Sequence, residues 1–265
     1  MAYRLSATRL QTYRRCAQAY YWRYEKRLPG PAGFGGTALG TSLHRCLAQF
    51  HGDWDAQDPQ PSRAWLALCW RAIATDLNQE QQHEGWQILE TYYREQIQPQ
   101  ATWQRPLAIE GRIQATLVLE GIEFLVSGRY DRLDLREDGL HLVDYKSAKR
   151  LEPPRPEQID VQLGLYQLAL EQRYGQLKSL SLVHLRSGQA YCYGCTTQQR
   201  EAVLEQIATL AQQIRSDQQW QPQVGEQCRS CGYRRYCPAV NAEAEPIPET
   251  ITSSSDRRIQ LSLAL

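Results

Sequence analysis

The fold is decided by the stretch GRYDRLDLREDGLHLVDYKS, which covers residues 128–147. Apolar residues alternate on both sides of Asp138-Gly139, a dipeptide typical of tight turns, so the pattern predicts two antiparallel strands. Side chains two residues apart on a strand point the same way, which places Asp144 and Lys146 on one face and Tyr145 on the other. The hairpin can also bring Asp131 beside Asp144. The stretch therefore predicts two carboxylates and an ammonium group close together.

This arrangement is suited to phosphodiester hydrolysis. The carboxylates of Asp131 and Asp144 are the hard oxygen ligands that Mg²⁺ or Mn²⁺ prefers. Such an ion binds a phosphate oxygen and lowers the pKa of its water, while Lys146 orients the nucleophile or stabilises developing charge. A surface hairpin with solvated salt bridges gives the same local pattern. Asp134 falls on the opposite strand face and is interpreted as structural, and Glu110 as a solvated strand residue, with a supporting role at the site as the alternative.

The whole chain has 265 residues, of which 42% are hydrophobic, and 30 Lys+Arg stand against 29 Asp+Glu. This length can bury a large core, which excludes disorder, and the near-neutral charge indicates no particular partner. The longest apolar stretch, 161–170, is about half the ~20 residues that a bilayer crossing needs. The first residues lack the apolar segment of a secretory signal, so a cytoplasmic location is expected.

The pattern around the hairpin predicts an α/β fold. Three antiparallel strands are expected over 107–119, 122–135 and 140–146, and two more over 179–186 and 189–195. Helices are expected over 62–78, 82–98, 159–174 and 200–215, and another, capped by Thr41 or Ser42, carries His44. Residues 1–242 are predicted to form one domain, and the polar segment 243–265 a flexible tail.

The first 30 residues combine seven basic and six aromatic residues with one acid. Such a mixture suits a phosphate backbone with stacked bases. An amphipathic helix with an aromatic core face and a solvated arginine face has the same composition. Both interpretations remain open at this point.

In a reducing compartment the eight cysteines are not expected to form a disulfide framework, so their spacing indicates metal or redox chemistry. Three of them, Cys228, Cys231 and Cys237, lie within ten residues and can hold one metal centre, with a fourth ligand from elsewhere. A zinc ribbon formed by Cys192 and Cys195 with Cys228 and Cys231 is the alternative.

Several motifs resemble, in order, those of the RecB-like branch of the PD-(D/E)xK nuclease superfamily. The layout is most similar to the CRISPR-associated RecB-like exonucleases and to the iron–sulfur nuclease domain of AddB. The matching segments are GTSLH at 40–44, GRYDRLD at 128–134, VDYK at 143–146 and QLGLY at 162–166. The resemblance covers residues 5–240 and implies a restriction-endonuclease-like core, with a mixed central β-sheet flanked by helices.

The resemblance also implies roles for individual residues. It implies that His44, Asp131 and Asp144 bind Mg²⁺ or Mn²⁺ together with the carbonyl of Tyr145, and that Asp131, Asp144 and Lys146 are catalytic. It further implies that Gln162 and Tyr166, which share a helix face, support the site or the DNA.

For the cysteines, the resemblance implies a [4Fe–4S] cluster that joins the two ends of the chain, with Zn²⁺ as the alternative. Its ligands would be Cys16, Cys228, Cys231 and Cys237. The function expected on this basis is a metal-dependent DNA exonuclease acting on single-stranded or end-opened DNA, in repair, recombination or CRISPR-related processing. A non-cleaving DNA-binding subunit and an RNA-directed nuclease are the alternatives.

The last six residues, QLSLAL at 260–265, resemble the bacterial sliding-clamp-binding peptide. In this interpretation Gln260, Leu261, Leu263 and Leu265 contact the clamp. A short apolar peptide on a flexible tether is a common means of capturing a partner. A tail that folds back on its own domain is the alternative.

Overall fold

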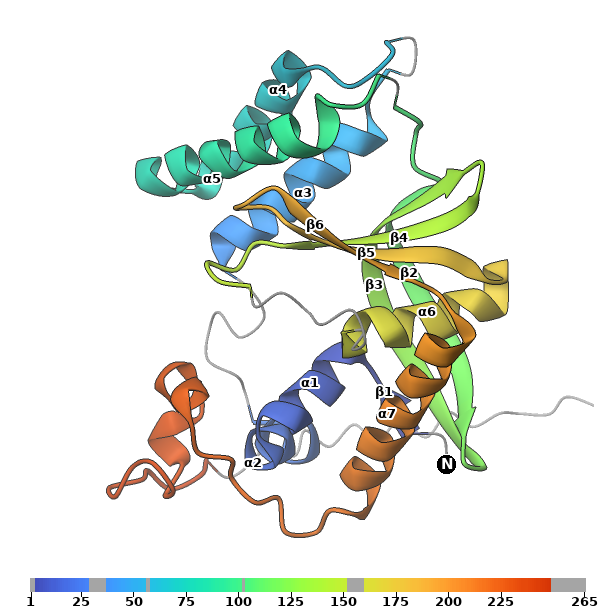
Figure 1. Ribbon diagram of the computed structural model, residues 1–265. Coiled ribbons are helices and arrows are strands. Elements are labelled where there is room, and N and C mark those ends of the chain that lie inside the picture. Colours follow the sequence, from blue (N-terminus) through green and yellow to red (C-terminus); the bar gives the residue numbers. More distant parts are fainter. Residues whose placement is uncertain (1–2, 29–36, 56–57, 102, 152–159, 249–265) are drawn as a thin grey trace, which may run out of the picture.

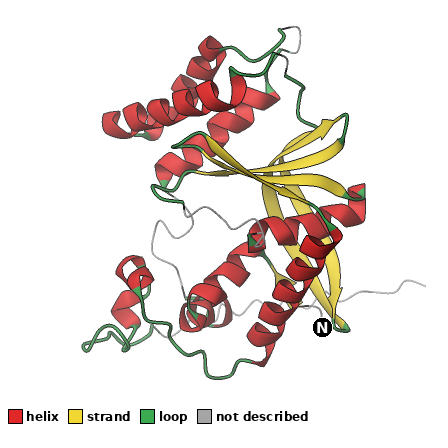
Figure 2. Cartoon of the chain, viewed as in Figure 1, coloured by secondary structure: helices red, strands yellow, loops and turns green. Residues whose placement is uncertain are grey.

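The computed structural model describes residues 3–28, 37–55, 58–101, 103–151 and 160–248. In these residues a six-stranded mixed sheet lies between two groups of helices, as Figure 1 shows and Figure 2 marks by element type. The predicted α/β class with a mixed central sheet is confirmed. No helix in the described ranges is long and apolar enough to cross a membrane. The clamp-like peptide at 260–265 lies outside the described residues.

The sheet is organised around its longest strand, β3. The strands are β1 (Tyr3–Leu5), β2 (Ala108–Leu119), β3 (Ile122–Arg136), β4 (Gly139–Lys146), β5 (Leu177–His184) and β6 (Gln189–Gly194). Their order is β1-β3-β4-β5-β6, and β2 pairs with β3. The β1–β3 and β4–β5 pairs are parallel and the others antiparallel. The three antiparallel strands predicted around the hairpin are therefore present.

The helices lie on both faces of the sheet (Figure 1). They are α1 (Ala7–Arg15), α2 (Ala17–Tyr20), α3 (Ala38–Gly52), α4 (Arg63–Ile73), α5 (Gln79–Tyr92), α6 (Val161–Tyr174) and α7 (Thr197–Ser216). Short helical turns are η1 (Tyr21–Glu25), η2 (Ala74–Asp76), η3 (Tyr93–Ile97), η4 (Glu226–Ser230) and η5 (Arg234–Tyr236). Helices α3 to α5 cover one face, and α6 and α7 with α1 cover the other.

Three helices begin earlier than predicted because a polar side chain upstream caps them, and Thr196 does so for α7, which begins at Thr197 instead of residue 200. Thr37, rather than Thr41 or Ser42, caps α3, and its hydroxyl accepts a hydrogen bond from the backbone N–H of Gly40 at 3.0 Å. Asn78 begins α5 at Gln79 instead of residue 82, through a reciprocal pair of hydrogen bonds with Gln81.

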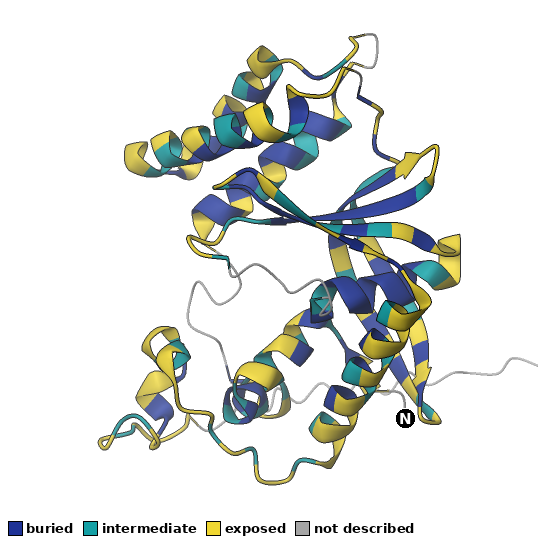
Figure 3. Cartoon of the chain, in the orientation of Figure 1, coloured by how far each residue is buried: buried dark blue, intermediate teal, exposed yellow. Residues whose placement is uncertain are grey.

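The alternation along β4 separates two hydrophobic cores, and the buried positions are marked in Figure 3. Leu140 and Leu142 belong to the core beneath α6 and α7. Val143 and Tyr145 belong to the core beneath α3, α4 and α5. The residues that follow in the same alternation, Asp144 and Lys146, therefore share the α6 side.

A third, small core joins the two ends of the described chain. Trp22 and Leu28 pack with Tyr233, Tyr236 and Cys237. The hydroxyl of Tyr233 donates a hydrogen bond to the carbonyl of Leu28 at 3.3 Å. The C-terminal turns η4 and η5 are thereby attached to the N-terminal helices.

The basic, aromatic N-terminal segment is amphipathic, with aromatic residues on its core face and arginines in solvent. Tyr20 and Trp22 are buried, whereas Arg14 and Arg15 are exposed. The ring of Trp220 stacks on Tyr20, with centroids 5.6 Å apart. These aromatic residues therefore pack between the N-terminal helices and the segment after α7.

Candidate active site

Three carboxylates form a row across β2, β3 and β4. Arg132 pairs with Val143 in the β3–β4 ladder, so the next positions, Asp131 and Asp144, are opposite each other. Glu110 lies between Ile109 and Gly111, whose partners on β3 flank Asp131. Paired positions of antiparallel strands share a face and lie close together. The register therefore gathers acids from three neighbouring strands.

Asp131 is held from two sides. Its Oδ1 lies 2.9 Å from Nδ1 of His44, which α3 carries to the sheet. Its Oδ2 accepts a hydrogen bond from the backbone N–H of Tyr145 at 2.6 Å. The backbone of Tyr145, the proposed source of a metal-binding carbonyl, is thus fixed next to the carboxylate of Asp131.

Asp144 and Lys146 point to the same place, as the strand period predicts, and α6 adds a third group. Lys146 Nζ lies 2.7 Å from Asp144 Oδ2. Gln162 connects the two, since its amide N–H donates to Asp144 Oδ1 at 2.7 Å and its carbonyl accepts from Lys146 Nζ at 2.9 Å. Asp160 caps α6 and so fixes the first turn, from which Gln162 extends.

The surroundings of the site shift the charges of its members. Burial raises the pKa of Asp144 to about 6, although Lys146 pulls in the opposite direction. Burial opposes the charge on Lys146, but the carboxylate of Asp144 raises the pKa of Lys146 above its ordinary value. Burial also opposes the charge on His44, yet the hydrogen bond and charge of Asp131 raise the pKa of His44. Lys146 is therefore positively charged at neutral pH.

The residues at the row fit a divalent cation. Single ligand atoms of His44, Glu110 and Asp131 lie within 4.8 Å of one another. They combine an imidazole nitrogen with carboxylate oxygens, a donor set that suits Mn²⁺ and also Mg²⁺. In the part of the chain that the structure describes, this is the one such group of three ligand residues.

Glu110 lies at the site, although the sequence predicts a solvated strand residue at this position. Its side chain is only 29% exposed and turns toward Asp131, which contradicts the interpretation as a solvated strand residue. Burial and the charge of Asp131 raise the pKa of Glu110. Its backbone has φ of 50°, a conformation uncommon for residues other than glycine. The register opposite Asp131 was the available signal, but it becomes visible only once the strands are paired.

Tyr166 lies one turn after Gln162 on α6 and packs against the backbone of β3. A Cβ atom added to Gly128 would lie 2.6 Å from Cε1 of the Tyr166 ring. The glycine of the GRYD motif therefore makes room for this tyrosine. The structure brings Gln162 to Asp144 and Lys146, and places Tyr166 beside the strand that carries Asp131.

A buried network occupies the other face of the same strands. Arg132 Nη1 donates to the hydroxyls of Tyr145 at 2.7 Å and Tyr92 at 3.1 Å. Its Nε lies 2.9 Å from Oδ1 of Asp134. Burial, reinforced by Arg132, lowers the pKa of His51 well below its ordinary value, so this neighbouring imidazole is neutral. Asp134 is structural, as predicted from its strand face.

The site opens into a cleft of about 1030 Å³ between α3 and the segment after β4. His44, Glu110, Asp131 and Lys146 line it, and so do further basic residues. These are Arg45, Arg129, Lys149 and Arg186. Arg186 is paired with Glu84 of α5 at 2.7 Å, whereas Arg45 and Lys149 are exposed. The cleft thus offers positive charge near the row of acids.

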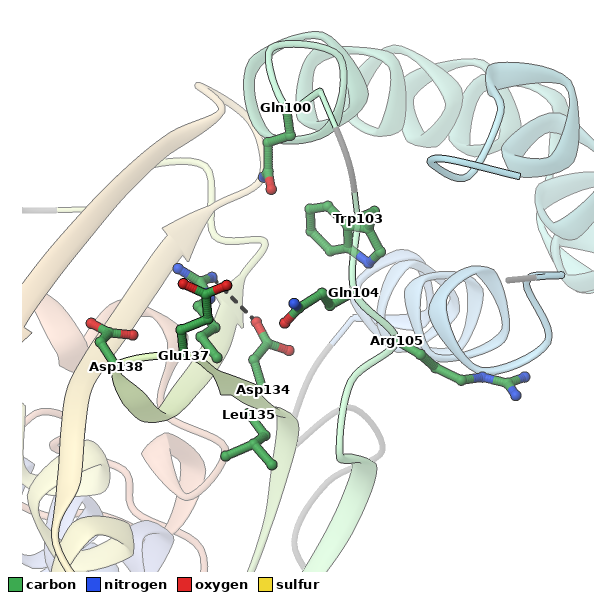
Figure 4. Close-up of a pocket in the computed structure, with 9 residues that line it drawn as sticks. Gln100, Trp103, Gln104, Arg105, Asp134, Leu135, Glu137 and Asp138 are labelled. Carbon is green, nitrogen blue, oxygen red and sulfur yellow. Dashed lines mark hydrogen bonds and ion pairs between the residues drawn. The ribbon is translucent and has the colours of Figure 1, made fainter. Parts of the chain in front are cut away.

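A second cavity, of about 390 Å³, lies at the turn between β3 and β4 (Figure 4). Figure 4 shows Trp103 and Gln104 on one side and Glu137 and Asp138 on the other. Its lining residues do not include His44, Asp131 or Lys146. It is therefore separate from the carboxylate row.

The six cysteines considered as metal ligands do not all lie together. Cys16, Cys228, Cys231 and Cys237 line a common cavity between the N-terminal helices and the C-terminal turns. In the described ranges, no three cysteine sulfurs lie within 4.8 Å of one another, so they form no tight site for a single ion. Cys195 belongs to the core beneath α6 and α7, and Cys192 is exposed on β6. The alternative zinc set needs both beside Cys228 and Cys231, and the described residues contain no such group of ligand atoms within 4.8 Å of one another.

A family model described as the PD-(D/E)XK nuclease superfamily matches residues 4–238. Among solved structures, the chain is similar to one titled "Crystal structure of SSO0001", with 15% identity and a TM-score of 0.43 over 90% of this chain and 87% of that one. No curated protein matches the sequence.

Proposed function

The chain belongs to the PD-(D/E)XK nuclease superfamily, and from that premise we propose that it is a metal-dependent nuclease that hydrolyses phosphodiester bonds of DNA. The observation that carries the proposal is the arrangement of Asp131, Asp144 and Lys146, with His44 beside them, at the edge of a cleft lined by basic residues. Two carboxylates and a cation at one point match the demands of phosphodiester hydrolysis.

The metal would be held by His44, Asp131, Asp144 and the carbonyl of Tyr145. When bound, a divalent cation would neutralise charge on the scissile phosphate and lower the pKa of a bound water. Lys146, kept protonated by Asp144, contributes a fixed positive charge where negative charge develops. Gln162 holds Lys146 and Asp144 in this orientation.

We further propose that the substrate is single-stranded or end-opened DNA and that the cleavage is exonucleolytic. The motif layout, which resembles the RecB-like branch with its CRISPR-associated and AddB-type members, supports this finer assignment. The exposed Arg45 and Lys149 of the cleft suit a phosphate backbone on either side of the reacting bond. Repair, recombination or CRISPR-related processing would be the setting.

The test is a time course on end-labelled single-stranded DNA with Mn²⁺ or Mg²⁺. Stepwise, metal-dependent shortening is expected, and Asp144→Ala and Lys146→Ala should abolish it without loss of helical circular dichroism. Lys178→Ala, on the neighbouring strand β5 and exposed, is the matched control and should cut normally. Activity retained in either site variant refutes the assignment. Wild-type protein that binds DNA without cutting supports a non-cleaving subunit, and preference for RNA supports the RNA-directed alternative.

We also propose a [4Fe–4S] cluster on Cys16, Cys228, Cys231 and Cys237. Their shared cavity and the packing of Trp22 on the C-terminal turns support it. A four-iron core is larger than a single ion, so its cysteine ligands need not approach one another as closely. Anaerobically purified protein should be brown and contain iron and sulfide, and Cys231→Ser should remove the colour while Cys192→Ser keeps it. Colourless protein with zinc would overturn the cluster.

For the tail, we propose that residues 260–265 bind a sliding clamp. Only the sequence pattern supports this proposal. Deleting these six residues should abolish capture of the purified clamp while nuclease activity on free DNA is kept. Equal capture with and without the peptide would contradict it.

A further inference from the structure

The carboxylates of the row differ in how much of their binding capacity is already in use. Both oxygens of Asp144 are engaged, one by Gln162 and one by Lys146, each at 2.7 Å. Asp144 is also almost completely buried, with 3% of its surface exposed. The carboxylate of Asp144 therefore already has two protein partners before a cation binds.

On the other side of Asp131 the situation is different. Glu110 lines the cleft and lies 3.3 Å from Nη1 of Arg129, whose side chain is 57% exposed. A long and exposed ion pair of this kind is weak and easily exchanged. The ligand atoms of Glu110, Asp131 and His44 are at the same time close enough to share one ion.

We propose that Glu110 is an additional ligand of the divalent cation, beside His44 and Asp131. The inference rests on the proposed nuclease function and adds a residue to its metal site. The imidazole in the set favours Mn²⁺ over Mg²⁺.

In this arrangement Asp131 has a second carboxylate on each side. Glu110, on the β2 side, helps to hold the cation. Asp144, on the β4 side, binds the cation and also orients Lys146 through the contact that it already makes. Asp131 lies between Glu110 and Asp144.

The experiment measures Mn²⁺ binding by electron paramagnetic resonance of the free ion, without DNA, in the full-length protein. Glu110→Gln keeps the shape of the side chain and removes its charge, and should weaken Mn²⁺ binding by about tenfold or more. Raising Mn²⁺ should then restore part of the cleavage. Arg129→Met is the matched control, because it removes the salt bridge of Glu110 but leaves the carboxylate. It should bind Mn²⁺ at least as tightly as the wild type.

Equal Mn²⁺ affinity in Glu110→Gln and wild type would overturn the inference while the proposed function stands. The same holds if Arg129→Met weakens binding as much as Glu110→Gln, because Glu110 would then act only through Arg129. Wild-type protein that neither binds Mn²⁺ nor cuts DNA would overturn both.

A second measurement needs no variant and remains decisive if Glu110→Gln does not fold. Fe²⁺ in the metal site, treated with ascorbate and peroxide, cuts the polypeptide near the ion. Fragments ending near residues 44, 110 and 131 are expected. Cuts near 131 and 144 without one near 110 would contradict the proposal.

Discussion

Arg132 offers the sharpest test of how the fold supports the site. Its guanidinium is 5% exposed and contacts Asp134, Tyr145 and Tyr92 within 3.1 Å. Replacing it by methionine fills most of the volume but leaves the carboxylate of Asp134 buried without its main partner. Removing one member of a buried ion pair costs about 3–5 kcal/mol. We therefore expect Arg132→Met to lower the free energy of unfolding by about that amount.

Arg136→Met is the matched control for this measurement. Arg136 contacts the other oxygen of Asp134 at 3.4 Å, but its side chain is 51% exposed. Because solvent screens exposed pairs, its loss should cost no more than about 1 kcal/mol. Urea unfolding followed by far-ultraviolet circular dichroism compares the two, and adding Asp134→Asn to Arg132→Met should recover part of the loss. The reasoning is refuted if both single variants lose the same amount, or if Arg132→Met stays within about 1 kcal/mol of the wild type.

Three further predictions concern the site and its supports. Because the pKa of His44 is raised in the folded protein, the charge on His44 stabilises the fold at low pH, and this contribution fades as pH rises. In EDTA, His44→Gln should therefore lower the free energy of unfolding more at about pH 5.5 than at about pH 8.5. An equal loss at both pH values would contradict the raised pKa. Tyr145→Phe should lose about 1–3 kcal/mol, measured in urea, yet keep its cleavage rate, since it removes only the hydroxyl, which contacts Arg132, and keeps the ring beside His44; loss of cleavage in a folded variant would show otherwise. Gly128→Ala should cost about 1–3 kcal/mol by pushing on Tyr166, while Gly194→Ala, with no atom closer than 3.7 Å to the new Cβ, should unfold like wild type; equal stability of the two would argue against the close packing.

Local periodicity was enough to predict the centre of the site. The two-residue repeat places Asp144 and Lys146 together, and the turn at Asp138-Gly139 sets the register that brings Asp131 beside them. These relations are short-range in sequence or depend on one hairpin, so the pattern of residues encodes them directly. Gln162, in contrast, was implied by the family resemblance of QLGLY at 162–166 and not by spacing alone.

Other features depend on contacts that no local pattern encodes. Strand β1 has three residues, too few for a recognisable alternation, and forms only because β3 offers a parallel partner. Glu110 is turned toward the site by a left-handed backbone conformation, which sequence does not reveal for a glutamate. Trp220 adopts a positive φ of 49° while its ring is stacked against Tyr20 and Tyr21, and its role depends on residues about 200 positions away in the chain.

The carboxylate row also sets a rule for how this protein can change in evolution. Glu110, Asp131 and Asp144 meet because the number of residues between them, across two turns, is fixed. Gaining or losing one residue within β3 would rotate the following positions to the opposite face, so that Arg132 and its buried partners would exchange places with the acids. A substitution on these strands changes one side chain, but a single-residue insertion between the acids disrupts both the carboxylate row and the buried core on the other face. Length between the acids should therefore vary less among descendants of this chain than the identity of the residues that fill it.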